Sequence, residues 1–279
     1  MELNKALFIS QEITPYLPAT VMSLLGRNVP QMLQEKGVEV RTFMPKYGRI
    51  NERRNQLHEV IRLSGLNIVI DDTDHPLIIK VATLLPSRMQ VYFIDNDDYY
   101  FHRTGETGLE TMTHPEDNDE RIMFFARGVI ETVQKLRWVP SMVHCSGWAT
   151  ALTPLYIRRM YADAPTLHDS KIIYSLFGDS VPRPLDKAMQ DKMKMDGFTD
   201  DDIRLLIDAE KIDDVTLGKI AIHYSDAIVQ AVPDVNPELL EYAEASGKPL
   251  LPYPGDMDPE AACQDPEVLD SYLQFYNSL

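Results

Sequence analysis

Short apolar runs alternate with segments of helical periodicity, and this alternation limits the possible folds of the chain more than any other feature. Runs of strand type cover residues 5–10, 38–44, 78–84, 91–94, 142–145, 172–177 and 227–231. Segments with apolar side chains at helical spacing cover residues 21–36, 118–136, 149–160, 215–224 and 238–245. Continuous apolar strands that alternate with helices are typical of a parallel sheet covered on both faces. The sequence therefore predicts an α/β fold with a doubly wound parallel sheet.

The loops that follow the predicted strands show where a ligand site is expected. Crossovers between parallel strands are right-handed, so these loops meet along one edge of the sheet, where open α/β sheets bind ligands. The loops cover residues 11–17, 45–50, 95–108, 146–148, 178–184 and 233–236. We expect any binding or catalytic site to draw on them.

The last stretch of the chain differs in composition from the rest. Residues 1–245 are expected to form one domain, because a single core stops growing at a chain length of roughly 250–300 residues. Residues 246–266 contain five prolines, and apolar side chains then recur at helical spacing over residues 267–277. We therefore expect residues 246–279 to form a proline-rich tail and a closing helix that packs on the domain.

Net charge limits the classes of partner. Forty-three acidic residues against 27 basic residues give a formal net charge of −16 and an isoelectric point near 4.8. Nucleic-acid binding requires a basic footprint, so a nucleic-acid partner is excluded. The acidic side chains gather in residues 95–120 and 196–214. For both stretches the composition favours a solvated loop or helix face over a metal site.

The length of the apolar runs and the number of cysteines indicate the cellular compartment of the protein. The sequence has no run of about 18 apolar residues, which a transmembrane helix needs. The apolar run at residues 6–9 is too short for a secretory signal. Cys145 and Cys263 are the only cysteines, too few for a disulfide framework. We therefore expect a cytoplasmic protein that makes no membrane contact.

Familiar catalytic motifs are absent. Neither G-x-G-x-x-G nor G-x-x-x-x-G-K-[ST] occurs. His144 and Cys145 are neighbours on a strand, so their side chains point to opposite faces and are not expected to form a dyad. Gly178-Asp179-Ser180 begins like a nucleophile elbow, but Pro182 stands where that motif requires glycine. The histidines form no H-x-x-x-H pair, so we expect neither a metal nor a cofactor.

Six segments carry a family resemblance that covers nearly the whole chain. Glu12-Ile13-Thr14-Pro15-Tyr16 resembles E-[VI]-x-P-[FY], and residues 138–148 resemble W-x-P-D-[IV]-[IV]-H-x-H-D-W. The other matching segments are residues 44–50, 91–96, 117–127 and 219–226. These motifs are similar to those of bacterial starch/glycogen synthases, retaining ADP-glucose glucosyltransferases with two Rossmann-like lobes, the GT-B fold. The resemblance implies a single Rossmann-like lobe, the N-terminal acceptor lobe of such an enzyme.

The same resemblance implies candidates for the substrate crevice. The family motifs place these candidates at Tyr16, Tyr47, Asn96, His144, Trp148 and Lys219. Three further positions depart from the family pattern: Pro18 replaces the lysine of K-T-G-G, Gly147 the aspartate of H-x-H-D-W, and Phe177 the histidine of T-[VI]-H-N. Proline lacks an amide donor, and phenylalanine neither donates to a sugar hydroxyl nor stabilises developing charge. No catalytic residue is therefore assigned.

These departures bear on activity. In the family a donor lobe follows a segment similar to residues 254–258, whereas this sequence continues for only about 25 residues. Catalysis in this fold takes place between two lobes that position donor and acceptor together. The resemblance therefore implies a non-catalytic relative, a pseudoenzyme that binds α-glucan or another protein as a scaffold or regulator.

Two alternatives stay open at this point. The first is an active glucosyltransferase that borrows a donor lobe from a partner subunit or works as a homo-oligomer. The second is an interaction protein whose acidic face recruits a basic partner.

Overall fold

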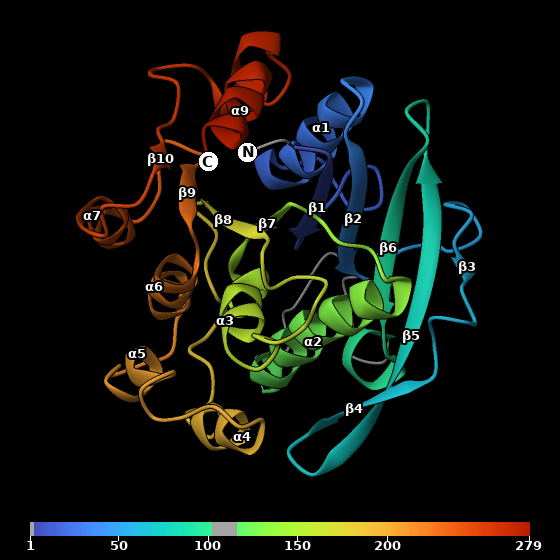
Figure 1. The fold of residues 1–279 in the computed structure, drawn as a ribbon, viewed down its shortest axis with the longest axis vertical. Helices are drawn as coiled ribbons and strands as arrows, with labels where there is room; N and C mark the ends of the chain where they lie inside the picture. Colours follow the sequence, from blue (N-terminus) through green and yellow to red (C-terminus); the bar gives the residue numbers. More distant parts are fainter. Residues whose placement is uncertain (1–2, 102–115) are drawn as a thin grey trace.

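The computed structural model describes residues 3–101 and 116–279 (Figure 1). The strands are β1 (Lys5–Ser10), β2 (Glu39–Pro45), β3 (His58–Glu59), β4 (Leu66–Ile70), β5 (Thr73–Leu84), β6 (Met89–Asp95), β7 (Met142–Ser146), β8 (Lys171–Leu176), β9 (Ala227–Gln230) and β10 (Leu250–Leu251). The α-helices are α1 (Val21–Glu35), α2 (Asn118–Leu136), α3 (Thr153–Arg158), α4 (Met189–Met195), α5 (Arg204–Ile207), α6 (Asp214–Tyr224), α7 (Pro237–Ala245), α8 (Pro259–Ala262) and α9 (Pro266–Ser278). A π-helical turn, η1 (Asp97–Phe101), and a 3₁₀ turn, η2 (Trp148–Thr150), complete the described elements.

One mixed sheet forms the centre of the molecule. Its strand order is β10-β9-β8-β7-β1-β2-β6-β5-β3, and β4 pairs with β5. All neighbours from β10 to β6 are parallel. From β1 the chain builds outward through β2 to β6, and then returns to the other side of β1 with β7. The α/β class and the doubly wound arrangement are confirmed, and the point where the strand order reverses lies between β1 and β7.

The helices divide between the two faces according to the direction of each crossover. The β1–β2 crossover contains α1, whereas the crossovers from β6 to β9 contain α2, α3 and α6 and run in the opposite direction along the sheet. Right-handed connections therefore place α1 on one face and the other three on the opposite face. In Figure 1, α9 lies beside α1, and α2 lies beside α3.

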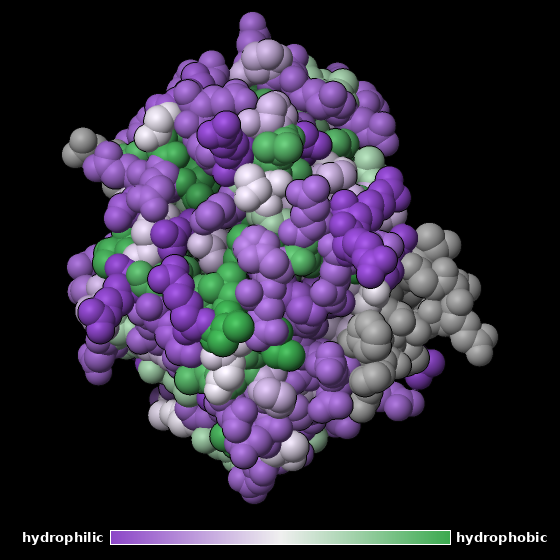
Figure 2. Space-filling view, turned by 90° about the vertical axis from the view of Figure 1, so that its right-hand side faces the viewer, coloured by the Kyte–Doolittle hydropathy of each residue, from purple (hydrophilic) through white to green (hydrophobic). Residues whose placement is uncertain are grey.

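One edge of the otherwise parallel sheet is antiparallel, which the sequence did not predict. β5 pairs antiparallel with β6, and β3 and β4 pair antiparallel with β5. Only residues 85–88 join β5 to β6, and a parallel pair needs a crossover of about a dozen residues or more, so these strands can only form a hairpin. Figure 2 shows the molecule from this side, where hydrophobic residues appear among hydrophilic ones over its middle.

The predicted helix over residues 149–160 is also wrong in part. The structure has the short turn η2 and then α3, which begins only at Thr153. Pro154 occupies the first turn of α3, where the missing amide hydrogen leaves no helical bond unmade. Proline therefore starts a new helix at this point instead of continuing an earlier one.

The acidic stretches are less solvated than expected. Asp95 is 1% exposed and lies 2.8 Å from the Lys80 ammonium. Asp196 accepts hydrogen bonds from Arg127 at 2.7 Å and from Tyr156 at 2.6 Å. These carboxylates hold helices and strands together, so the prediction of a solvated face is wrong for them. Residues 102–115 of the first stretch lie outside the described residues.

The C-terminal stretch runs back along α1. Residues 246–266 contain β10, which adds a parallel edge to β9, and the short helix α8. The Asn28 side chain donates a hydrogen bond to the Cys263 carbonyl at 2.8 Å, and Lys36 pairs with Asp270 at 2.9 Å. These contacts join α8 and α9 to the outer side of α1.

Candidate functional site

An open cavity of about 360 Å³ lies at the carboxyl ends of β1, β8 and β9. Three of the six predicted loops contribute to it: Gln11 and Glu12 after β1, residues 177–179 after β8, and Asp234 after β9. Val232 after β9, residues 20–22 at the start of α1 and Pro259 of α8 complete its walls. This position, beside the point where the strand order reverses, is where open α/β sheets bind ligands.

The N-terminus of α1 at this cavity is capped by the chain's own groups. The Thr20 hydroxyl accepts a hydrogen bond from the Ser23 amide at 3.0 Å, and the Thr20 amide donates to the Ser23 hydroxyl at 2.9 Å. The Thr20 hydroxyl also donates to Glu12 Oε2 at 2.7 Å. A helix N-terminus favours an anion, and here the Glu12 carboxylate already lies beside it. A phosphate group at this position would have to approach that carboxylate.

Carboxylates dominate the charge of the cavity. Glu12, Asp179 and Asp234 line it, and its described lining contains neither lysine nor arginine. The pKa of Asp179 is raised to about 6, mainly by burial and also by the negative charges of Glu12 and Asp214, against the lowering effect of the Trp148 amide, which donates to Asp179 Oδ2 at 3.1 Å. At neutral pH the cavity therefore carries a negative potential.

The departures from the family pattern are built into this region. Gly147 has a φ of +90°, and a Cβ atom there would lie 2.9 Å from Gln11 Oε1 and from Met22 Sδ. An aspartate would be strained and would collide with both side chains. Phe177 lines the cavity, whereas Pro18 is exposed and its carbonyl accepts a hydrogen bond from the Ser23 hydroxyl at 3.0 Å.

Three of the crevice candidates are buried, and their side chains contact other residues of the domain. Tyr16 packs edge-on against Phe93 with ring centroids 4.9 Å apart, and burial raises its pKa to about 12. The Tyr47 hydroxyl donates to the Gln11 carbonyl at 3.1 Å. The Asn96 amide group donates to the Pro76 carbonyl at 3.0 Å.

His144 and Trp148 are buried as well. His144 is 3% exposed, its Nδ1 lies 2.7 Å from the Tyr276 hydroxyl, and its Nε2 lies 2.6 Å from the Ser175 hydroxyl. Burial lowers the pKa of His144 to about 3, so the imidazole is neutral at physiological pH. Trp148 is 4% exposed, and its backbone amide holds Asp179.

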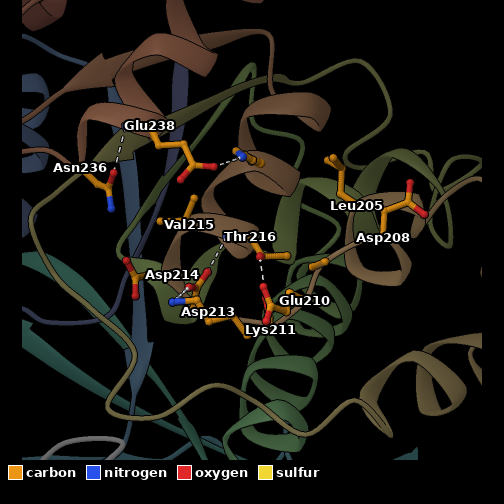
Figure 3. A pocket seen from close by; sticks show the side chains of 12 residues that line it. Leu205, Asp208, Glu210, Lys211, Asp213, Asp214, Val215, Thr216, Asn236 and Glu238 are labelled. Atoms are coloured by element: carbon orange, nitrogen blue, oxygen red, sulfur yellow. Dashed lines mark hydrogen bonds and ion pairs between the residues drawn. The ribbon is translucent and has the colours of Figure 1, made fainter.

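Lys219 lies in a different cavity (Figure 3). This cavity, of about 610 Å³, is lined by residues of α5 and α6, the connection between them, and the start of α7. Its lysines are paired within the chain: Lys219 with Glu238, and Lys211 with Asp213 at 2.8 Å. This cavity is larger, but it lies over helices and not at the ends of β1 and β8, so we place the candidate site in the 360 Å³ cavity.

None of the six crevice candidates, all within the described residues, lines the cavity at the sheet edge. The residues that do line it were not singled out as candidates, although Glu12, Asp179 and Asp234 fall in three of the predicted loops. Asp179 was considered only as part of a failed nucleophile motif. The signal that could have found them is their common place after the parallel strands.

The described residues contain neither a metal-binding cluster nor a membrane-spanning helix. In residues 3–101 and 116–279, no three His, Cys, Asp or Glu side chains are arranged to hold a metal ion. In the same ranges, no helix combines the length and the apolar character that crossing a bilayer requires.

The fold and the position of the cavity define the class of protein. The sheet is mostly parallel and doubly wound, with a cavity at the carboxyl ends of its strands, and this architecture matches one lobe of the GT-B fold. The catalytic domain of starch synthase IV from Arabidopsis thaliana, solved with ADP and acarbose, superposes with a TM-score of 0.71 at 17% identity, over 93% of this chain and 53% of that one.

The sequence comparisons identify the family. Residues 5–249 match the starch synthase catalytic domain, and the chain belongs to that family. A glycogen synthase of Chlorobaculum parvum is 30% identical over 252 residues, which cover 87% of this chain and 48% of the relative. A glycogen synthase of Chlorobium chlorochromatii is 36% identical over 173 residues, 62% of this chain and 35% of the relative. The chain thus spans half or less of the length of these relatives.

Proposed function

We propose that this chain is a starch synthase-type acceptor lobe in the cytoplasm that binds α-glucan and does not transfer glucose from ADP-glucose by itself. The observation that carries the proposal is the chemistry of the cavity at the ends of β1, β8 and β9. It has three carboxylates, no cation in its described lining, and a helix N-terminus beside which Glu12 lies.

This charge opposes a nucleotide diphosphate. Two like charges roughly 6 Å apart repel by on the order of 3 kcal/mol at an effective dielectric constant of about 20. Three carboxylates facing a diphosphate therefore oppose binding by more than the roughly 4 kcal/mol that corresponds to millimolar affinity. Pro18 and Gly147 offer no side chain that would offset this repulsion.

The same lining suits a neutral polyol. The carboxylates of Glu12 and Asp234 can accept hydrogen bonds from sugar hydroxyls, and such charge-assisted bonds are the stronger kind. Phe177 and Met22 present apolar surface to the C–H face of a pyranose ring. The cavity volume lies within the range of about 300–1,000 Å³ that is usual for small-molecule sites.

Affinity electrophoresis in a gel that contains glycogen tests the glucan-binding part. We expect the wild-type protein to be retarded relative to a gel without glycogen. Asp234→Ala should reduce the retardation, because Asp234 lines the cavity and is exposed enough for its replacement to leave the fold intact. Glu210→Ala, which removes the same charge from the other cavity, is the matched control and should migrate like the wild type. Unretarded wild-type protein would overturn glucan binding.

An assay with ADP-glucose that is radiolabelled in its glucose tests whether the chain transfers glucose to glycogen. The label that enters glycogen is measured. We expect no incorporation with the purified chain. Incorporation by the purified chain alone would contradict the proposal. Incorporation only after addition of a cell extract that lacks its own synthase would instead indicate a donor lobe from a partner subunit.

A further inference from the structure

Two small hollows lie next to the open cavity, and α9 borders both of them. Each has a volume of about 10 Å³. Phe177 separates the open cavity from the hollow at His144 and Ser175, and Pro259 separates it from the hollow at Cys263. Tyr272 of α9 lines both hollows. The three spaces are therefore neighbours divided by single side chains, and α8 and α9 contribute two of these dividing residues.

The attachment of α9 is narrow. Its fully buried side chains are Val268, Tyr272 and Tyr276, spaced four residues apart in a single stripe, whereas α2 buries 13 of its 19 residues. Partly buried apolar side chains widen this stripe: Leu269, Leu273, Phe275 and Leu279. The connection before α8 is exposed around Gly255, which has a φ of +63°. Segments with few buried apolar contacts open locally at lower free energy than the core of the same protein. The unit of α8 and α9 therefore has the features of a segment that opens on its own.

Besides the part-buried hydrogen bond from Asn28 to the Cys263 carbonyl, one fully buried polar contact holds this unit closed. The hydrogen bond between Tyr276 and His144 lies in the core, since these residues are 0% and 3% exposed. In contrast, the ion pair between Lys36 and Asp270 is exposed, at 42% and 49% of the two side chains. An exposed ion pair contributes little to stability, so the hydrogen bond between the Tyr276 hydroxyl and His144 is the main polar contact of the unit. We call this hydrogen bond the latch.

We propose that α8 and α9 form a lid whose opening extends the open cavity into a longer groove for an α-glucan chain. In the closed state Tyr272 and Tyr276 fill the part of the groove that reaches His144 and Ser175. In the open state His144 Nδ1, released from the Tyr276 hydroxyl, is free to bond a hydroxyl of a further glucose unit, while His144 Nε2 keeps its contact with Ser175. The inference rests on the proposed glucan binding and adds its regulation: the lid sets how long a chain segment the lobe accepts.

The two cysteines of the chain provide a test of lid opening. Cys263 lies between α8 and α9 and is 1% exposed, whereas Cys145 lies in β7 and is 0% exposed. Both thiols would be labelled with iodoacetamide at pH 8, and after quenching and proteolysis the label at each cysteine would be followed by mass spectrometry of its peptide. We expect Cys263 to react at least about tenfold faster than Cys145, since local opening is more frequent than global unfolding. Equal rates for the two thiols would overturn the lid.

A pair of variants tests the latch. Tyr276→Phe removes one hydroxyl and leaves His144 Nδ1 without its partner, so the labelling rate of Cys263 should rise by roughly tenfold. Lys36→Ala removes the exposed ion pair and should change that rate by less than about twofold. The Cys145 rate in each variant reports global stability. A Tyr276→Phe variant with an unchanged Cys263 rate, or with both cysteines accelerated equally, would contradict the latch.

Labelling of Cys263 in the presence of maltoheptaose tests whether an α-glucan chain occupies the groove. Because it binds the open form, it should accelerate Cys263 labelling with the same midpoint concentration that calorimetry gives for binding. Binding by calorimetry without any change in the Cys263 rate would refute the groove and leave the proposed function intact. If calorimetry shows no binding of maltoheptaose, both the proposed function and the glucan as occupant of the groove are refuted. The Cys263 labelling rates of Tyr276→Phe and Lys36→Ala then still decide whether the lid opens.

Discussion

Because the imidazole of His144 is buried and neutral, we predict that the free energy of unfolding depends on pH. Its ring nitrogens face two hydroxyls, Tyr276 at 2.7 Å and Ser175 at 2.6 Å, and burial lowers its pKa to about 3. One nitrogen donates and the other accepts, because hydroxyl groups can take either role. A protonated ring would have two donors and a positive charge in the core, which the folded state resists.

The magnitude follows from the difference between the folded and unfolded states. In the unfolded chain a histidine has a pKa of roughly 6.5. The folded value is lower, so the unfolded state binds the proton first, and stability is lost as the pH falls below about 6.5. The loss approaches about 1.4 kcal/mol per pH unit and reaches about 2 kcal/mol at pH 5, where the folded ring is still neutral. Above about pH 7 the group contributes no pH dependence.

Urea unfolding of the wild type and of His144→Asn between pH 8 and pH 5 isolates this effect. Asparagine has no titrating group, so the variant lacks the loss on acidification, although it is less stable at pH 8 because its packing and hydrogen bonds are poorer. The gap in free energy of unfolding between the two proteins should therefore shrink by about 2 kcal/mol from pH 8 to pH 5. Comparing the two proteins removes the contribution of Asp179, whose raised pKa acts in the opposite direction. A constant gap would refute a neutral, dehydrated His144.

Three further substitutions test the site and its support. Gly147→Asp should destabilise the fold by about 2 kcal/mol, since the backbone is left-handed there and the side chains of Gln11 and Met22 would have to shift, and a thermal midpoint equal to that of the wild type would contradict this. Thr20→Ala should lower the free energy of unfolding by about 1 kcal/mol through loss of the α1 cap, and Thr20→Ser should recover most of it in urea unfolding. Lys80→Met should cost about 3 kcal/mol or more at pH 7, because it removes the ammonium group that pairs with the buried Asp95 carboxylate. Burial already raises the pKa of Asp95, so this loss should shrink on acidification, and a pH-independent loss would count against the pairing.

Local periodicity predicted the parallel part of the fold. The bounds of β1 and α2 coincide with the predicted ranges, because each is a continuous apolar run or a clear helical stripe. The hairpin of β4 and β5 escaped prediction. Pro76 interrupts the apolar pattern of β5 in its first half, and only pairing with β4 makes that half a strand. Tertiary pairing of this kind leaves no trace in the spacing of side chains.

The candidate site was predictable in position but not in its residues. Edge loops of a doubly wound sheet were expected to form it, and the cavity does lie there. The family motifs, however, pointed to residues such as Tyr47 and His144 that this chain uses inside its core. Glu12 and Asp234 are more than 200 residues apart in sequence, and only the strand order β9-β8-β7-β1 brings the loops that carry them to one cavity. Single carboxylates in loops carry no spacing that would reveal this.

Calorimetric titration of the purified chain with maltoheptaose and with ADP-glucose tests the central claim most directly. The carboxylate-lined cavity predicts saturable binding of the neutral oligosaccharide and no binding of the nucleotide sugar at millimolar concentration. Double replacement of Glu12 and Asp234 by Gln and Asn should weaken the first and leave the protein folded. Saturable binding of ADP-glucose to the wild-type chain would contradict the account. So would a lack of binding of both maltoheptaose and ADP-glucose.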